Sequence, residues 1–183
     1  MKNSILKDIT PEWTLFIDRD GVVNDEKHLD YIHTWDEFKF YKDVKDAFQI
    51  FNNKFGRIIM VTNQRGVARG LTKLEDLHII HKNMLQEIEE AGGRIDKIYF
   101  CAEMESPNRK PNPGMGLQAL KDFPDIDLSK SMMIGNTLSD MNFGRNLGVA
   151  INVFLTTTRK EVDIKDATID FSFKDLISVA KLL

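Results

Sequence analysis

The chain has 183 residues, of which 42% are hydrophobic and 29% are charged, and its formal net charge is −3 at pH 7. This size and composition are typical of one soluble domain, which we expect to span residues 1–183, and no apolar stretch approaches the roughly 20 residues of a membrane helix. The acidic balance argues against nonspecific nucleic-acid binding through a broad basic surface.

Apolar runs and helical spacings alternate along the first hundred residues. After an irregular stretch over 24–41, each segment with helical spacing stands between two short apolar runs that suit buried strands. Thr72 and Glu75 have the spacing of a capping box, with Thr72 as the N-cap of the second helix. In chain order, the predicted elements are strand 13–17, helix 43–54, strand 57–61, a helix from Thr72 to the Gly92-Gly93 pair, and strand 97–101.

The same alternation continues to the end of the chain. A helix is expected after Gly114, and its predicted inward positions are Leu117, Leu120 and Phe123. This alternation predicts an α/β fold, a parallel sheet with helices on both faces. The later elements are strand 131–134, helix 138–147, strand 149–155, a short strand near 168–169 and helix 174–182.

Two carboxylates stand two residues apart where the first strand ends. Asp18 and Asp20 precede Gly21, and the two-residue period of a strand points both side chains to one face. In open α/β sheets, the carboxyl ends of the strands are where ligands bind. Crowded carboxylates repel each other unless a cation or a proton lies between them. A solvated turn fits this segment equally well when it is taken alone.

The second polar cluster follows the second strand and suits an anion. Thr62 and Asn63 offer a hydroxyl and an amide, and Gly66 frees the backbone to turn its amides outward. Arg65 and Arg69 suit a phosphate or carboxylate through forked hydrogen bonds. A polar loop between a strand and a helix is the alternative for this segment.

The third and fourth clusters add cations and oxygen donors. Arg109 and Lys110 lie in a proline-stiffened loop, where a fixed ammonium suits the spreading negative charge of a phosphoryl transition state. Asn136 and Asp140 follow the fourth strand and offer the hard oxygen ligands that Mg²⁺ prefers. A helix cap made by Ser139 or Asp140 is the alternative for the fourth cluster.

Together the four clusters resemble the four sequential motifs of the haloacid dehalogenase superfamily in order, spacing and placement at strand ends. The wider runs around them look like those of heptose-bisphosphate phosphatases and the related histidinol phosphatases, from about Leu15 to Leu155. The resemblance implies a Rossmann-like fold without a large cap domain. The segments that carry it are Asp18-Arg19-Asp20-Gly21 with Asn24, Thr62-Asn63-Gln64 to Gly70, Arg109-Lys110-Pro111, and Gly135-Asn136 with Asp140.

The resemblance also implies a role for each matching residue. Asp18 would be the nucleophile that forms an aspartyl-phosphate, and Asp20 would protonate the leaving alkoxide and then activate water. Thr62 and Lys110 would hold the transferring phosphoryl group. Mg²⁺ would be bound by the Asp18 carboxylate, the backbone carbonyl of Asp20 and the fourth motif, Asn136 and Asp140. The residues implied for substrate contacts are Asn63, Gln64, Arg69 and Arg109.

Two departures from the family pattern bear on metals. Asn136 and Thr137 stand where relatives usually have an aspartate and, in heptose enzymes, a lysine. The neutral amide removes one negative charge beside the cation, which predicts weaker Mg²⁺ binding, with Asp140 shifting inward to compensate. The loop after the third strand offers Cys101 without the further Cys and His ligands of a structural zinc site, so no structural zinc is expected.

Several aromatic residues flank these motifs. His78 and His81 lie three apart on the long predicted helix, and we expect them to be at the surface or half-buried rather than to bind a metal. Tyr31, His33 and Trp35 follow the first motif, where they either touch substrate or pack the flap beside the pocket.

We therefore expect a Mg²⁺-dependent phosphomonoester hydrolase acting on a small phosphorylated metabolite, with a heptose bisphosphate favoured. The alternatives are a histidinol-phosphate phosphatase, a polynucleotide 3′-phosphatase, which the acidic balance disfavours, and a phosphosugar-binding regulatory protein, which Asn136 keeps open. A single cysteine and the lack of a signal-peptide pattern favour a cytoplasmic protein. We expect a monomer or small homo-oligomer that binds neither membrane nor nucleic acid.

Overall fold

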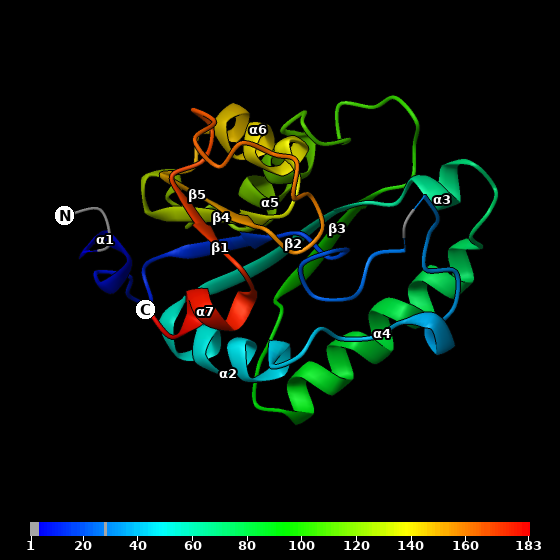
Figure 1. Cartoon of the computed structure of the whole chain (residues 1–183), viewed down its shortest axis with the longest axis horizontal. Helices are drawn as coiled ribbons and strands as arrows, with labels where there is room; N and C mark the ends of the chain where they lie inside the picture. Colours follow the sequence, from blue (N-terminus) through cyan, green and yellow to red (C-terminus); the bar gives the residue numbers. More distant parts are fainter. Residues whose placement is uncertain (1–3, 28) are drawn as a thin grey trace.

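A computed structural model, which describes residues 4–27 and 29–183, contains one parallel sheet between two layers of helices (Figure 1). The strand order is β3-β2-β1-β4-β5-β6, and every neighbouring pair is parallel. The predicted α/β class is confirmed. The strands are β1 (Thr14–Ile17), β2 (Arg57–Asn63), β3 (Lys97–Cys101), β4 (Ser131–Gly135), β5 (Ile151–Leu155) and β6 (Phe171–Phe173).

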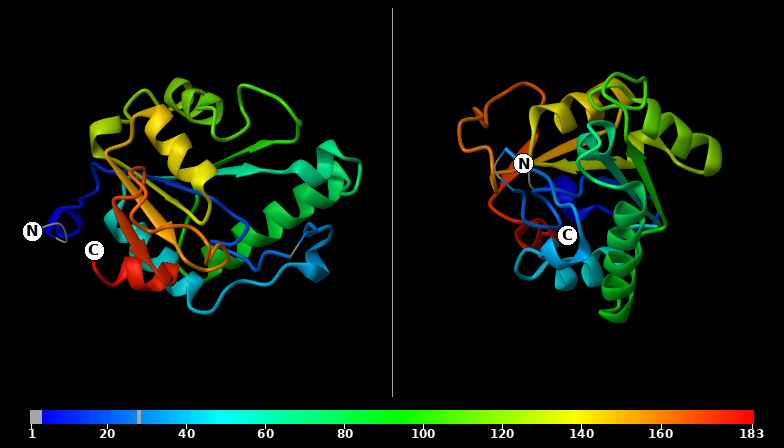
Figure 2. Two further views of the ribbon diagram at one scale, coloured as in Figure 1. Left: turned by 45° about the horizontal axis from the view of Figure 1, so that its top comes forward. Right: turned by 90° about the vertical axis from the view of Figure 1, so that its right-hand side faces the viewer.

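Helices cover both faces of the sheet. They are α1 (Ser4–Lys7), α2 (Val44–Lys54), α3 (Arg65–Ala68), α4 (Leu74–Glu90), α5 (Gly114–Asp122), α6 (Leu138–Leu147) and α7 (Leu176–Ala180), with 3-10 turns at Trp35–Glu37 and Leu128–Lys130. α2, α4 and α7 cover one face, and α5 and α6 cover the other (Figure 2). None of the helices in the described part of the chain is long and apolar enough to span a bilayer.

Alternate residues of β1 belong to two separate hydrophobic cores. Leu15 and Ile17 pack into the core under α2, α4 and α7. Phe16 points to the opposite face, where its ring centroid lies 6.4 Å from that of Phe143 in α6. A strand covered on both faces has no polar alternation, which is why a continuous apolar run predicted it.

β1 lies where the strand order reverses. The chain builds β2 and β3 on one side of β1, then returns to place β4 on the other side. In open parallel sheets, this reversal leaves a crevice at the carboxyl ends of the two central strands. Asp18 follows β1 and donates its backbone N–H to Ile134 of β4 at 3.0 Å. The first and fourth motifs therefore meet at this crevice.

The capping box predicted at Thr72 is wrong. α4 begins at Leu74 after Lys73, which forms no side-chain cap. The Thr72 hydroxyl lies 2.8 Å from Nδ1 of His33, far away in the sequence, so a tertiary contact takes the oxygen that would have capped the helix.

Two other details of the predicted elements differ. Leu117, expected to face inward, is exposed, because Met115 and Ala119 form the buried face of α5. The short C-terminal strand lies at Phe171–Phe173 rather than near 168–169. Helix 138–147 and strand 97–101 agree with the prediction at both ends.

Candidate active site

A cavity of about 480 Å³ opens at the carboxyl ends of the central strands. Each of the four polar clusters contributes to its lining, so segments far apart in the sequence meet at one edge of the sheet. The predicted site residues that line it are Asp18, Asp20, Asn63, Arg69, Arg109, Lys110 and Asp140.

Lys110 is the buried centre of this cavity. Its Nζ lies 2.8 Å from Oδ1 of Asp18 and 2.6 Å from Oδ1 of Asp140, and it donates to the Val61 carbonyl at 2.7 Å. These three acceptors match the three donors of an ammonium group. Burial alone would lower the pKa of Lys110, but the carboxylates of Asp140 and Asp18 raise it above its usual value. The lysine is therefore held charged and in one orientation.

The backbone of Lys110 is fixed by Asn63. The Asn63 Nδ2 donates to the Lys110 carbonyl, and its Oδ1 accepts from the Lys110 N–H, both at 3.0 Å. A residue at the end of β2 thus holds the loop that carries the lysine. The substrate contact expected for Asn63 stays a prediction.

Asp18 is buried beside more negative charge than Lys110 neutralises. Burial raises the pKa of the Asp18 carboxyl to about 7, the charge of Asp140 adds to the rise, and Lys110 opposes it. A carboxyl in this state binds either a proton or a further cation. The surroundings of Asp18 therefore favour a positively charged ligand.

Asp20 is held as a carboxylate by several donors. Arg19 Nη2 contacts its two oxygens at 2.8 and 3.0 Å, Asn24 Nδ2 donates at 3.0 Å, and Gln64 Nε2 donates at 2.9 Å. Burial alone would raise the pKa of Asp20, but the charge of Arg19 and these hydrogen bonds lower it below its usual value. Asp20 is consequently ionised, which is the form in which a carboxylate can act as a base.

Gln64 connects Asp20 to Thr62. Its Nε2 also donates to the Thr62 hydroxyl at 2.9 Å, so both amide hydrogens are engaged. Thr62 is almost fully buried at the end of β2. The structure gives Gln64 a positioning contact, and its expected contact with substrate stays a prediction.

Asp140 is held by Lys110 and by the start of α6. Its Oδ1 contacts Lys110, and its Oδ2 accepts from the backbone N–H and the hydroxyl of Thr137 at 3.0 and 2.7 Å. Thr137 and Asp140 form a capping box at the start of α6. Oδ2 also accepts from the Asn136 backbone N–H at 3.2 Å, so both carboxylate oxygens are engaged within the protein. The metal contact expected for Asp140 stays a prediction.

Asn136 offers an oxygen without a hydrogen-bond partner. Its Nδ2 donates to the Thr158 hydroxyl at 2.6 Å and to Oε2 of Glu26 at 3.2 Å. Its Oδ1 is buried and has no partner within the described part of the protein. An unpartnered buried oxygen is costly, and hard oxygens are the ligands of Mg²⁺. The Asp18 carboxylate and this amide oxygen therefore fit a magnesium ion.

A cation at this position needs ligands beyond carboxylates. In residues 4–27 and 29–183, no three His, Cys, Asp or Glu side chains are grouped as a metal cage. Mg²⁺ commonly binds through one or two carboxylates, with waters and substrate phosphate completing its coordination. The donor set of this cavity is of that kind.

The sequence did not predict the contact between Arg19 and His81. Arg19 is buried, and its Nη1 lies 3.1 Å from Nε2 of His81. Burial, followed by the charge of Arg19, lowers the pKa of His81 to about 3, so the ring is neutral and accepts from Arg19. The expected surface or half-buried position is wrong for His81, which is 7% exposed. Its helical spacing from Leu77 and Met84, both buried, could have revealed this.

Three arginines at the mouth of the cavity have no carboxylate partner in the described part of the chain. They are Arg65, Arg69 and Arg109. Arg69 Nη1 donates to the Tyr31 hydroxyl at 3.4 Å, a long contact, and Arg109 Nη1 lies 3.4 Å from the Glu103 carbonyl. These cations are available to an anionic ligand.

Of the three aromatic residues after the first motif, Tyr31 lines the cavity. His33 contacts Thr72, and Trp35 stacks on Phe38 with ring centroids 5.0 Å apart. His33 and Trp35 therefore have the packing role that was one of the two expectations for this segment.

Comparisons with known proteins show which family the chain is similar to. The family described as polynucleotide kinase 3 phosphatase matches residues 14–178. The D-glycero-alpha-D-manno-heptose-1,7-bisphosphate 7-phosphatase of Campylobacter jejuni is 36% identical over 150 residues, which are 81% of this chain and 86% of that protein. A D-glycero-beta-D-manno-heptose-1,7-bisphosphate 7-phosphatase of Helicobacter pylori is 32% identical over 176 residues, covering 91% of this chain and 96% of that protein.

A solved structure shows the same architecture. D,D-heptose 1.7-bisphosphate phosphatase from B. bronchiseptica, complexed with magnesium and phosphate, superposes with a TM-score of 0.81 at 26% identity. The match covers 92% of this chain and 96% of that one. That neighbour thus holds both groups that the cavity described above would suit.

Proposed function

The chain belongs to the haloacid dehalogenase superfamily of phosphatases, and we propose that it is a Mg²⁺-dependent sugar-bisphosphate phosphatase that favours a heptose 1,7-bisphosphate. The observation that carries this proposal is the buried Asp18–Lys110–Asp140 cluster beneath three arginines that lack carboxylate partners within the described residues. The heptose bisphosphatases among the relatives support the substrate class.

In the first step, an Asp18 oxygen attacks phosphorus while the bond from phosphorus to the sugar oxygen breaks. The proton that the leaving oxygen needs comes from Asp20, and the negative charge of the incoming phosphate favours protonated Asp20. In the second step, Asp20 takes a proton from water, whose oxygen attacks phosphorus and releases phosphate and the Asp18 carboxylate. The hydrogen bonds that hold Asp20 as a carboxylate suit this second step.

Lys110 and Thr62 hold the phosphoryl group during both steps. The ammonium of Lys110 is already fixed between two carboxylates, so its charge needs no reorganisation when the transition state forms. The Asp18 carboxylate, the Asp20 backbone carbonyl and Oδ1 of Asn136 would hold Mg²⁺. When bound, the ion would neutralise negative charge on the phosphoryl oxygens.

The second phosphate of a bisphosphate suits the mouth of the cavity. Arg69 and Arg109 present forked guanidinium groups there, and neither is engaged with a carboxylate in the described structure. Asn63 and Gln64 would contribute substrate contacts from the end of β2. A polynucleotide 3′-phosphatase is the second candidate because of the matching family, and the net charge of −3 speaks against it.

A phosphate-release screen of the purified protein with and without Mg²⁺ tests the proposal. It includes the α and β anomers of heptose 1,7-bisphosphate, histidinol phosphate, other sugar phosphates and a 3′-phosphorylated oligonucleotide. We expect Mg²⁺-dependent turnover of a heptose bisphosphate and none by Asp18→Asn. Turnover that survives in Asp18→Asn would reject the nucleophile, and preference for the oligonucleotide would reject the substrate class. Binding of a phosphosugar without any turnover would favour the regulatory alternative.

We further propose that residues 1–183 form one phosphatase domain that acts in the cytoplasm as a monomer or small homo-oligomer. The single continuous sheet of the described residues supports one domain, and the free, buried Cys101 suits a reducing compartment.

A further inference from the structure

The amide of Asn136 is fixed in one orientation by Glu26. A carboxylate only accepts hydrogen bonds, so the group that Asn136 presents to Oε2 of Glu26 has to be its Nδ2. The Thr158 hydroxyl accepts from the same Nδ2. With the nitrogen held on this side, the planar amide directs Oδ1 the other way, where it has no partner in the described residues.

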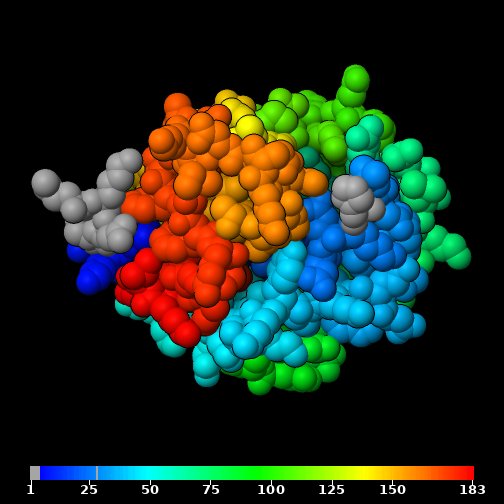
Figure 3. Space-filling view, viewed as in Figure 1, coloured from blue at the N-terminus to red at the C-terminus, as the bar shows by residue number. Residues whose placement is uncertain are grey.

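Glu26 is itself held by the segment that follows β5. Arg159 Nη2 contacts Oε1 of Glu26 at 2.5 Å, and the Thr157 hydroxyl donates to the Gly21 carbonyl at 2.5 Å. Figure 3 shows this connection after β5, in orange, lying against the blue loop that follows β1. Residues 156–159 therefore bind the first motif and the fourth motif to each other.

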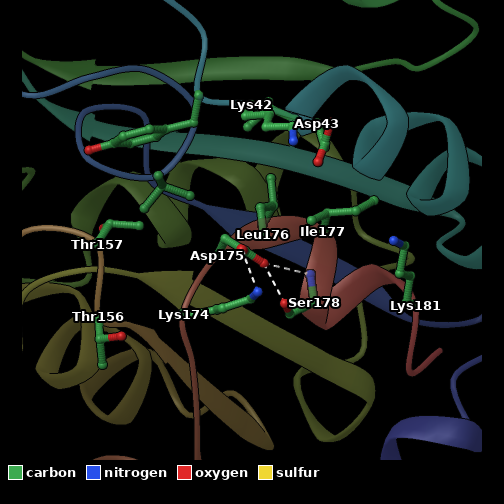
Figure 4. A pocket seen from close by; sticks show the side chains of 13 residues that line it. Lys42, Asp43, Thr156, Thr157, Lys174, Asp175, Leu176, Ile177, Ser178 and Lys181 are labelled. Carbon is green, nitrogen blue, oxygen red and sulfur yellow. Dashed lines mark hydrogen bonds and ion pairs between the residues drawn. The ribbon is translucent and has the colours of Figure 1, made fainter.

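The same segment has a second side that faces away from the active site. Thr156 and Thr157 line a separate cavity of about 550 Å³ beside α2 and α7 (Figure 4). The Asp175 side chain there accepts from Ser178 within α7. This cavity does not include Glu26 or Arg159, which both line the active-site cavity instead.

Gly21 shows how closely these groups pack. A Cβ at Gly21 would lie 2.0 Å from Nδ2 of Asn136 and 3.0 Å from Oε2 of Glu26. The backbone there has a φ of +77°, which glycine adopts without strain. The amide and the carboxylate therefore pack directly against the turn that follows Asp18 and Asp20.

We propose that Glu26 is a positioning residue of the divalent-cation site. It keeps the Asn136 oxygen free for the cation, and its charge, partly balanced by Arg159, stands in for the charge that an aspartate at 136 would supply. This inference rests on the proposed Mg²⁺-dependent function. Groups that orient metal ligands in this way commonly change metal affinity by about 10- to 100-fold when they are replaced.

The proposal predicts that the effect of Glu26→Gln reverses with the residue at 136. In the natural chain, glutamine can donate or accept, so the Asn136 amide is no longer fixed and we expect Mg²⁺ to bind about 10-fold more weakly. In an Asn136→Asp background, Glu26 is a like charge beside the new carboxylate. There we expect Glu26→Gln to tighten Mg²⁺ binding.

Calorimetric titration with Mg²⁺, without substrate, on the natural chain, both single variants and the double variant measures this directly. Glu26→Asp should recover part of the affinity, and Glu89→Gln, on the exposed face of α4, is the matched control. Unfolding in EDTA shows whether each variant is folded. Equal effects of Glu26→Gln in both backgrounds, or none in either, would overturn the role of Glu26. Absence of binding to all four proteins would instead reject Mg²⁺ as the cofactor, and the role of Glu26 with it.

Discussion

The floor and the mouth of the cavity use charged residues in opposite ways. At the floor, the Lys110 ammonium has three acceptors within 2.8 Å. At the mouth, Arg69 and Arg109 have long contacts to neutral oxygens and no carboxylate partner in the described structure. The ammonium at the floor is therefore satisfied within the protein, whereas the guanidinium groups at the mouth are available to an anionic ligand. From this comparison we expect different residues to carry the chemistry and the choice of substrate.

Replacing Lys110 by methionine should have the largest effect. The variant leaves the carboxylates of Asp18 and Asp140 buried without their cation, so we expect kcat to fall by at least about 1,000-fold. Loss of one partner of a buried ion pair should also lower the free energy of unfolding by about 3–5 kcal/mol. Steady-state kinetics and urea unfolding in EDTA measure the two effects.

Lys130→Met is the matched control, because Lys130 pairs with Glu12 at an exposed position. It should retain the activity of the natural protein. A Lys110→Met variant with more than a tenth of the natural kcat would contradict the fixed charge at the floor.

The double variant Arg69→Ala with Arg109→Ala tests the mouth. Each charge-assisted hydrogen bond to a phosphate contributes about 1.5–3 kcal/mol, so we expect KM for a bisphosphate to rise about 100-fold while kcat changes little. KM for a sugar monophosphate should change much less. Because these cations are solvent-accessible, salt should also raise KM more in the natural protein than in the variant.

Arg57→Ala serves as the control, since Arg57 pairs with Asp125 at the opposite end of β2. A fall in kcat without a change in KM in the double variant would remove the distinction between floor and mouth.

His81→Gln tests the contact between His81 and Arg19, the residue that binds Asp20, and should have the smallest effect. His81 is neutral when folded, with its pKa lowered to about 3 from 6.5. Below pH 6.5 the unfolded chain takes up a proton that the folded chain does not, so the stability contributed at neutral pH is lost as pH falls. Between pH 7 and 5, the free energy of unfolding should fall by about 2 kcal/mol more in the natural protein than in the variant. The glutamine of the variant does not titrate, and its amide oxygen can still accept from Arg19.

Chemical denaturation at pH 5, 6 and 7 measures this difference. His78→Gln, at an exposed position of the same helix, should not alter how the free energy of unfolding changes with pH. If the stability of His81→Gln fell with pH as steeply as that of the natural protein, the folded ring would take up a proton as readily as the unfolded one, and its pKa would not be lowered.

The sequence predicted those parts of the fold that depend on neighbours in the chain. Strand 97–101 and helix 138–147 were predicted at both ends, because a buried apolar run and a glycine after the helix are local signals. The capping box failed for the opposite reason. Thr72 and Thr137 have the same local pattern, but only Thr137 caps a helix, since His33 lies beside the Thr72 hydroxyl.

The candidate site shows the same division. The four clusters that line the cavity could be found because each ends a strand, and strand ends meet in a parallel sheet. The contacts of Arg19 with His81 and of Glu26 with Arg159 could not, because each joins segments that only the folded chain brings together. Asp140 was placed in the right cluster, but its contact with Lys110 depends on the loop that Asn63 fixes.

The contacts between the loop after β1 and the segment after β5 have a consequence for biosynthesis. Ribosomes deliver the chain from its amino terminus, so the Asp18 carboxylate emerges early, while Lys110 and then Arg159 are still untranslated. β1 also lacks one of its two neighbours until β4 has been made. A nascent chain therefore carries the apolar strand β1 with one edge unpaired through most of its synthesis. The candidate active site can assemble only after nearly the entire polypeptide has left the exit tunnel.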